Sequence, residues 1–265
     1  MESPVGPVEA VFIVGAGYSG STLLSMLLGA SADAVAVGEL RAFDRFIAES
    51  NPCSCGRRAH DCSFWRPLCD EIGSTAPLLY AASDRRSFLD RGADLFRMVA
   101  RRAGRRVAID SSKWPQWAEG MIARDVDALI VHLIRHPAAT VHSHRSRGTS
   151  LAQAIAIWRR RASEGRALAD RCQRATLVRY EDMVAEPEPT LRRLCQAAGI
   201  GFSPMMLVAP YGDGHHLIAG NPMRFAPQPV HPASQSWQTE LRPETIAQIR
   251  AATEDLATSF AYAWQ

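Results

Sequence analysis

The chain has 265 residues, a formal net charge of +3 and a hydrophobic fraction of 47%. A chain of this length and hydrophobicity can bury one large core, which excludes a mainly disordered protein. Its 30 basic residues are nearly balanced by 27 acidic ones, so the composition argues against wholesale binding to nucleic acid or to an acidic membrane surface.

The first thirty residues contain Glu2 and Glu9 but no lysine or arginine, which is the wrong charge for a secretory leader. No apolar run reaches the roughly 18 residues that a membrane-spanning helix needs. We therefore expect a cytoplasmic protein without stable membrane insertion. In a reducing compartment, cysteines are expected to be thiols rather than disulfides.

Short apolar runs alternate with helical patterns along the chain. Runs without polar alternation are typical of strands that are buried on both faces of a parallel sheet. In chain order, the pattern predicts strand 8–14, helix 21–28, strand 34–37, helices 40–48 and 88–103, strands 107–109 and 129–134, helices 138–147 and 151–171, strand 176–178, and helices 189–198 and 243–260. This alternation predicts a three-layer α/β fold with a mostly parallel central sheet in a single domain.

The domain is expected to span residues 1–265 and to contain two irregular segments. One is an insertion that contains cysteines, at about 44–105, and the other is a loop rich in Pro, Gly and His, at about 204–236. Long loops without secondary structure are often functional, so the second segment is expected to close over a ligand.

An anion-binding loop is predicted between the first strand and the first helix, where the chain reads Gly15-Ala16-Gly17-Tyr18-Ser19-Gly20-Ser21-Thr22. Successive backbone N–H groups and a helix N-terminus converge in such a strand, loop and helix, and this geometry binds anions. The glycines permit close approach, and the hydroxyl groups can donate to phosphate oxygens. The alternative interpretation is a tight turn without a ligand.

This P-loop-like segment lacks the lysine of a nucleotide triphosphatase. In the Walker pattern a lysine follows the last glycine, whereas here Ser21 follows Gly20. The difference counts against an ordinary ATPase or GTPase. Asp110 lies at the end of a later strand and could still hold magnesium, so an atypical nucleotide-dependent kinase is a second hypothesis.

Glu39, Lys113 and Arg135 each follow a predicted strand. Open α/β sheets bind ligands at the carboxyl ends of their strands, so we expect these side chains in one crevice. Glu39 is the candidate general base, and Lys113, the one lysine of the chain, can neutralise charge on a leaving group. The alternatives are a helix-capping role for Glu39 and a carboxylate partner for Arg135.

Short motifs occur along most of the chain: GAGYSGSTLL at 15–24, VGEL at 37–40, CSCG…C…FW at 53–65, IDSSK at 109–113, HLIRHPAATVHS at 132–143, LVRYEDM at 177–183 and HLIAGNPMRF at 216–225. Together and in this order they resemble bacterial sulfotransferases that use 3′-phosphoadenosine 5′-phosphosulfate (PAPS). The resemblance implies a P-loop-like fold and an enzyme without a required metal. It would move a sulfuryl group from PAPS to a hydroxyl or amine of a small-molecule, sugar or lipid acceptor, with 3′-phosphoadenosine 5′-phosphate (PAP) as the second product.

The resemblance also assigns roles to residues. The 5′-phosphosulfate would contact the loop residues Gly17, Tyr18, Ser19, Gly20, Ser21 and Thr22, and the 3′-phosphate would contact Arg135, Ser143 and Arg224. Glu39 would activate the acceptor, and Lys113 would stabilise the leaving phosphate. Many relatives carry a basic residue in place of Tyr18. Either Lys113 or another basic group supplies that charge, or activity toward the usual donor is weakened. Tyr18 also motivates a third hypothesis, in which the chain is a non-catalytic nucleotide-binding module.

Four cysteines, Cys53, Cys55, Cys62 and Cys69, form the pattern C-x-C-x₆-C-x₆-C. Four thiols this close in sequence can bind zinc, but the spacing is not that of a common ribbon or finger. Buried thiols are expected instead, and no metal site is predicted. The arginine clusters at 101–106 and 159–161 lie on predicted helices without interleaved aromatic residues, which indicates solvated faces rather than a nucleic-acid partner.

Overall fold

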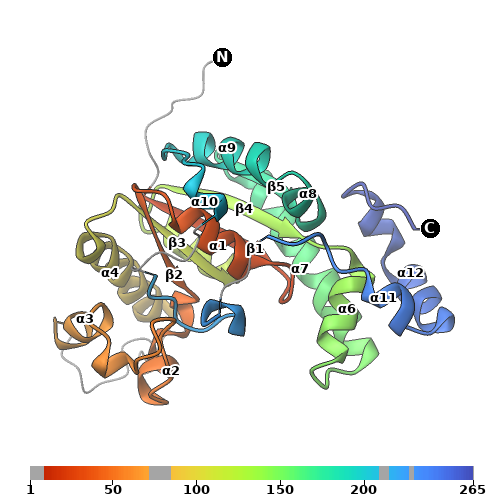
Figure 1. Cartoon of the computed structure of the whole chain (residues 1–265), viewed down its shortest axis with the longest axis horizontal. Helices are drawn as coiled ribbons and strands as arrows, with labels where there is room; N and C mark the ends of the chain where they lie inside the picture. Colours follow the sequence, from red (N-terminus) through yellow and green to blue (C-terminus); the bar gives the residue numbers. More distant parts are fainter. Residues whose placement is uncertain (1–8, 72–84, 209–214, 227–229, 265) are drawn as a thin grey trace.

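The central sheet has five strands and all of its ladders are parallel. The computed structural model describes residues 9–71, 85–208, 215–226 and 230–264. The strands are β1 (Ala10–Gly15), β2 (Ala34–Gly38), β3 (Val107–Lys113), β4 (Ala128–Ile134) and β5 (Ala175–Arg179). They lie in the order β2-β3-β1-β4-β5 (Figure 1). The predicted α/β fold with a parallel sheet is confirmed.

Helices join the strands and cover both faces of the sheet. They are α1 (Ser21–Gly29), α2 (Phe43–Ala48), α3 (Trp65–Glu71), α4 (Arg85–Ala103), α5 (Pro115–Ile122), α6 (Pro137–Arg145), α7 (Leu151–Arg171), α8 (Tyr180–Ala185), α9 (Pro187–Ala198), α10 (Met205–Val208), α11 (Ser236–Glu240) and α12 (Pro243–Thr258), with 3₁₀ turns η1 (Leu40–Ala42), η2 (Ala59–Asp61) and η3 (Pro222–Arg224). The predicted helix 151–171 has the bounds of α7. The sequence does not predict α3, α5 and α8, because helices of six to eight residues are too short to show a clear period.

Strand β1 runs through the centre of the core and alternates between its two halves. Ala10, Phe12 and Val14 pack into one hydrophobic cluster together with α4 and α5, whereas Val11 and Ile13 pack into a second cluster together with α1, α8 and α9. Both faces of the sheet are therefore buried, which explains why the strand sequences lack polar alternation.

The segment 215–226 runs along the edge strand β2. Ile218 bridges Gly38: its N–H donates to the carbonyl oxygen of Val37 at 3.0 Å, and its carbonyl oxygen accepts from the N–H of Glu39 at 2.9 Å. Gly38 has a φ of 78°, and a Cβ atom there would lie 2.1 Å from the Ile218 oxygen. Glycine is therefore needed for this close approach, which fixes the backbone next to Glu39.

Several sequence predictions fall partly outside the described residues, among them the first residue of the predicted strand 8–14 and the ends of the predicted domain 1–265. The cysteine-containing insertion includes 72–84, the loop at about 204–236 includes 209–214 and 227–229, and the charge argument against a secretory leader includes 1–8. The boundaries of the insertion and of the loop stay predictions. Among the helices that the structure describes, none combines the length and apolar character needed to cross a membrane.

Candidate active site

A cavity of about 710 Å³ opens where the strands end. It has the size of a pocket for a nucleotide-sized ligand. The segment after each of the five strands contributes to the lining: Gly17, Tyr18, Gly20, Ser21 and Thr22 after β1, Glu39 after β2, Lys113 at the end of β3, Arg135, Ser143, Ser146 and Arg147 after β4, and Tyr180 after β5, while Gly220, Asn221, Pro222 and Met223 close one side. The structure thus brings together all but two of the predicted site residues, Ser19 and Arg224.

The loop after β1 leads directly into the N-terminus of α1. Gly20 caps the helix with a φ of 91°, and a Cβ atom there would lie 2.4 Å from the ring of Tyr180. Glycine therefore lets Tyr180 pack against the loop. The first turn of α1 carries no acidic side chain, so the positive end of the helix dipole faces the cavity without compensation. Ser19 is buried beneath the loop, and its hydroxyl has no hydrogen-bond partner among the described residues.

Tyr18 lines the cavity at the position where the sequence resemblance leads us to expect a basic residue. Its backbone has a left-handed φ of 65°, and its ring meets the imidazole of His144 edge to face, with 4.7 Å between the ring centroids. Burial lowers the pKa of His144, so this imidazole does not supply the missing charge at neutral pH. Lys113, Arg135 and Arg147 are the cationic residues of the lining.

Arg135 is held by three contacts. Its Nη1 donates to the Tyr18 carbonyl oxygen at 3.0 Å, its guanidinium lies 4.6 Å from the centroid of the Tyr180 ring, and its own carbonyl oxygen accepts from Trp158 Nε1 at 2.9 Å. Its Nε is buried and has no partner among the described residues. The guanidinium is therefore fixed in place in the lining of the cavity.

Ser143 lies on α6, one turn from the C-terminal end of this helix. Its hydroxyl donates to the carbonyl oxygen of Ala139 at 2.9 Å. A serine oxygen that donates within its own helix can still accept or exchange a bond, so the side chain remains available to a ligand in the cavity that it lines.

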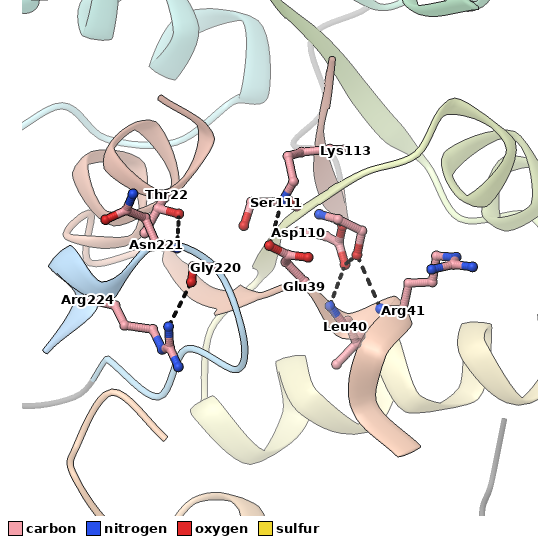
Figure 2. A network of polar contacts seen from close by, with 11 residues as sticks. Thr22, Glu39, Leu40, Arg41, Asp110, Ser111, Lys113, Gly220, Asn221 and Arg224 are labelled. Carbon is pink, nitrogen blue, oxygen red and sulfur yellow. Dashed lines mark hydrogen bonds and ion pairs between the residues drawn. The ribbon is translucent and has the colours of Figure 1, made fainter. Parts of the chain in front are cut away.

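Glu39 and Lys113 form an ion pair across the ends of the neighbouring strands β2 and β3 (Figure 2). Lys113 Nζ contacts Glu39 Oε1 and also donates to the Ser111 carbonyl oxygen at 3.1 Å. Lys113 has a left-handed φ of 66°, which turns the end of β3 toward Glu39. Both side chains are only partly buried, so a ligand in the cavity can reach them.

Asp110 binds the backbone next to both members of this pair. One carboxylate oxygen accepts from the Leu40 N–H at 3.1 Å (Figure 2). The two oxygens also accept from the Ser112 N–H at 2.7 Å and the Ser112 hydroxyl at 2.9 Å. The carboxyl group is buried, and this burial raises its pKa to about 6. Asp110 therefore positions the backbone beside Glu39, and both of its oxygens are already engaged by protein donors.

Arg224 lies outside the cavity lining. Its Nη1 donates to the Gly220 carbonyl oxygen at 2.8 Å, so the side chain turns back on its own loop (Figure 2), and its guanidinium stacks 4.1 Å from the Phe225 ring. Burial lowers the pKa of Arg224. The same loop is tied to α1, because the Asn221 N–H donates to Thr22 Oγ1 at 3.0 Å.

Sequence reasoning missed four polar residues of the lining, namely Tyr180, Ser146, Arg147 and Asn221. Tyr180 directly follows the last predicted strand, so the rule that placed the other residues at strand ends could have found it. Asn221 lies inside the motif at 216–225. Arg147 resembles the many other arginines of the chain, and its place in the cavity depends on the end of α6 at Arg145, two residues before the predicted helix end.

A family model described as the sulfotransferase family matches residues 10–204. Solved structures with the same fold include the sulfotransferase domain of the olefin synthase from Synechococcus PCC 7002, which is 24% identical with a TM-score of 0.70 over 100% of this chain and 99% of that chain. The sulfotransferase domain from the curacin biosynthetic pathway is 20% identical, with a TM-score of 0.65 over 99% of this chain and 100% of that chain.

Sulfotransferase STF9 from Mycobacterium avium is 12% identical, with a TM-score of 0.59 over 98% of this chain and 78% of that chain. At these identities the structural likeness shows the fold alone. No curated protein sequence matches the chain.

Proposed function

The chain belongs to the sulfotransferase family, and we propose that it transfers a sulfuryl group from PAPS to a hydroxyl or amine of a small-molecule, sugar or lipid acceptor. One observation carries the proposal. The anion-binding loop at the start of α1 shares a single cavity with the pair Glu39 and Lys113 and with the fixed guanidinium of Arg135. This arrangement offers an anion site, a base and a leaving-group partner within one cavity.

Donor binding follows from the positive groups of the cavity. The backbone N–H groups of the loop, the helix dipole and the hydroxyls of Ser21 and Thr22 would hold the 5′-phosphosulfate. Arg135 and Ser143, which both line the cavity, would hold the 3′-phosphate. Arg224 joins them only by exchanging its bond with the Gly220 oxygen for one with the phosphate. Lys113 and Arg147 provide the charge that Tyr18 does not.

The chemical step needs a base and a partner for the leaving group. The acceptor oxygen or nitrogen attacks sulfur, the bond from sulfur to the 5′-phosphate oxygen breaks, and its electron pair stays on PAP. The proton of the acceptor passes to Glu39, and Lys113 neutralises the charge on the leaving phosphate. The contact with Lys113 orients the Glu39 carboxylate in the cavity, and a bound donor would bring a second anion to the Lys113 ammonium group.

The two other hypotheses have less support. A kinase would need Asp110 for magnesium, but both carboxylate oxygens of Asp110 already accept hydrogen bonds from Leu40 and Ser112. A non-catalytic module would need neither a base nor a leaving-group partner, yet Glu39 and Lys113 lie together in the cavity. The sulfotransferase proposal uses both features.

The test of this proposal measures transfer of ³⁵S from labelled PAPS to a panel of phenols, alcohols, sugars, amines and lipid head groups. We expect labelled product that depends on an acceptor, and a loss of about 10²–10⁴-fold in turnover with Glu39→Gln, while PAP binding is retained. Glu49→Gln, an exposed carboxylate outside the cavity, is the matched control. If Glu39→Gln and Lys113→Ala both stay within about threefold of the unaltered protein, the proposed roles are wrong.

A further inference from the structure

Three cysteines and one histidine converge at a place that the proposed reaction does not use. The ligand atoms of Cys53, Cys55, Cys62 and His216 all lie within 4.8 Å of one another. Cys53 Sγ and Cys62 Sγ lie 3.6 Å and 3.2 Å from His216 Nδ1, and Cys55 Sγ lies 3.7 Å from Cys62 Sγ. Cys53, Cys55 and Cys62 come from the predicted insertion that contains cysteines, at about 44–105. His216 comes from the segment 215–226, which bridges Gly38 of β2 through Ile218.

We propose that these four side chains bind one Zn²⁺ ion through three thiolates and one imidazole nitrogen. In a tetrahedral site, Zn–S and Zn–N bonds of about 2.3 Å and 2.05 Å place two sulfurs about 3.8 Å apart and a sulfur about 3.5 Å from a nitrogen. Three of the six edges measure 3.7, 3.6 and 3.2 Å, and no two of the four ligand atoms lie more than 4.8 Å apart. Sulfur and imidazole ligands in a tetrahedron are the set that zinc prefers.

The backbone around the thiols forms a tight turn. The Cys53 N–H donates to the Arg57 carbonyl oxygen at 2.8 Å, and the Gly56 N–H donates to the Cys53 carbonyl oxygen at 2.8 Å. Gly56 supplies the left-handed φ of 80° that this turn needs. The turn places Cys53 and Cys55 on one side of the cluster, and Cys62 follows the η2 turn.

The histidine is held by groups other than the three thiols. Its ring stacks on Phe64 with 5.0 Å between the centroids and 5° between the planes, and its carbonyl oxygen accepts from Trp65 Nε1 at 2.8 Å. Ser54 links the two segments: its hydroxyl donates to the His215 carbonyl oxygen at 2.7 Å and accepts from the Leu217 N–H at 2.9 Å. These contacts orient the ligands before any ion binds, as the outer shell of a metal site does.

A disulfide and a group of unligated thiols both fit the cluster less well than a metal site. A disulfide between Cys55 and Cys62 would need a sulfur separation of about 2.05 Å, far shorter than the observed one. The expectation of buried thiols is wrong for Cys55, which is exposed, and buried thiols alone would not require a ring nitrogen beside them. Cys69, the fourth cysteine of the sequence pattern, is absent from the cluster and packs in the hydrophobic core. The proposal therefore departs from the sequence expectation of no metal, because the fourth ligand lies far along the chain.

Four protein ligands leave no open position on the ion, so its role is structural rather than catalytic. His216 is followed by Ile218, which bridges Gly38 beside Glu39, and then by Gly220 and Asn221 of the cavity lining. The ion would thus clamp the cysteine-containing insertion to the loop that closes the cavity. This site is independent of the donor and acceptor chemistry proposed above.

The first test is the metal content of the protein after expression with added zinc and purification under reducing conditions without a chelator. We expect about one zinc ion per chain, and a fall to background in Cys62→Ser and His216→Gln. The matched controls are Cys172→Ser and His60→Gln, which lie outside the cluster and should keep their zinc. Zinc retained by the cluster variants, or absent from the unaltered protein, would overturn the proposal.

A second test does not depend on variants that fold. Co²⁺ loaded into the unaltered protein after zinc removal should show the intense visible absorption of a tetrahedral thiolate site. Zinc removal should also expose three additional thiols to a thiol reagent and lower the melting temperature. A weak octahedral cobalt spectrum would contradict the site. Because these readouts need no PAPS, failure of the zinc site and failure of the sulfotransferase proposal are distinguishable.

Discussion

The guanidinium of Arg135 is oriented by contacts within the protein, without a ligand. It is bonded to the Tyr18 carbonyl oxygen and stacked on Tyr180, and this leaves only part of its donor set for a ligand. A planar, pre-oriented guanidinium loses little entropy when it binds phosphate through two N–H groups, which an ammonium group cannot reproduce. The position of Arg135 at a strand end is predictable from the sequence, whereas its stacking on Tyr180 depends on the folded neighbourhood.

We predict that Arg135→Lys weakens PAP binding by about 10–100-fold, because a bidentate charged contact is replaced by a point charge. The same substitution should change 5′-ADP binding by less than about threefold, since that nucleotide lacks the 3′-phosphate. Calorimetric titration of both nucleotides checks this. An equal loss for both would show that Arg135 does not contact the 3′-phosphate.

The buried environment of Asp110 predicts how the stability of the protein depends on pH. Burial raises the pKa of the Asp110 carboxyl group to about 6 from an unfolded value of 3.8, so the folded protein binds more protons than the unfolded chain between these values. The contribution to stability is present at low pH and is lost as the pH rises from about 4 to about 6. The shift of about two units corresponds to about 3 kcal/mol.

The measurement is the free energy of unfolding in urea for the unaltered protein and for Asp110→Asn, across this pH range. From about pH 4 to about pH 6 we expect the unaltered protein to lose about 2 kcal/mol of its free energy of unfolding relative to Asp110→Asn, and the whole loss, from well below about pH 4 to well above about pH 6, approaches about 3 kcal/mol. Comparison of the two proteins removes the titration of all other groups. A difference that is constant with pH, or that moves in the opposite direction, contradicts the buried environment of Asp110.

At the scale of elements, long periodic segments were predictable and short ones were not. The helix 151–171 matches α7 because its 21 residues show a clear apolar period. In contrast, α3 and α8 are short, and the path of 215–226 along β2 has no signal in the sequence. This path depends on Gly38, which meets the backbone of Ile218. Because His216 lies on the same path, the metal-ligating set could not be read from the cysteine spacing.

We predict that Gly38→Ala destabilises the protein by at least about 2 kcal/mol, since both a left-handed φ and a clash with the Ile218 carbonyl oxygen must be relieved. Gly104→Ala is the matched control, because Gly104 has a φ of 60° but nothing within 4 Å of an added Cβ. Gly104→Ala should lower the free energy of unfolding only by the cost of a left-handed φ, about 1–2 kcal/mol. Urea unfolding of both variants separates the two costs, and equal losses would refute the close approach at Gly38.

For the whole molecule, the parallel sheet explains most of what could be predicted about the site. Parallel strands bring Glu39, Lys113 and Arg135 to the same end of the sheet, so their positions after predicted strands are enough to place them together. Arg147 lines the cavity, whereas Arg224 does not and instead donates to its own loop. Both placements depend on the local path of the backbone, which short motifs do not encode.

The central claim is that the cavity is built for a nucleotide with a 3′-phosphate. The most direct measurement is the melting temperature of the purified protein with PAP (written 3′,5′-ADP below), 5′-ADP or Mg-ATP at matched concentrations. A ligand at about 100 times its dissociation constant adds about 2.7 kcal/mol of stability, which a melting curve resolves. The account predicts selective stabilisation by 3′,5′-ADP. Stabilisation by Mg-ATP alone, or equally by all three nucleotides, would contradict it.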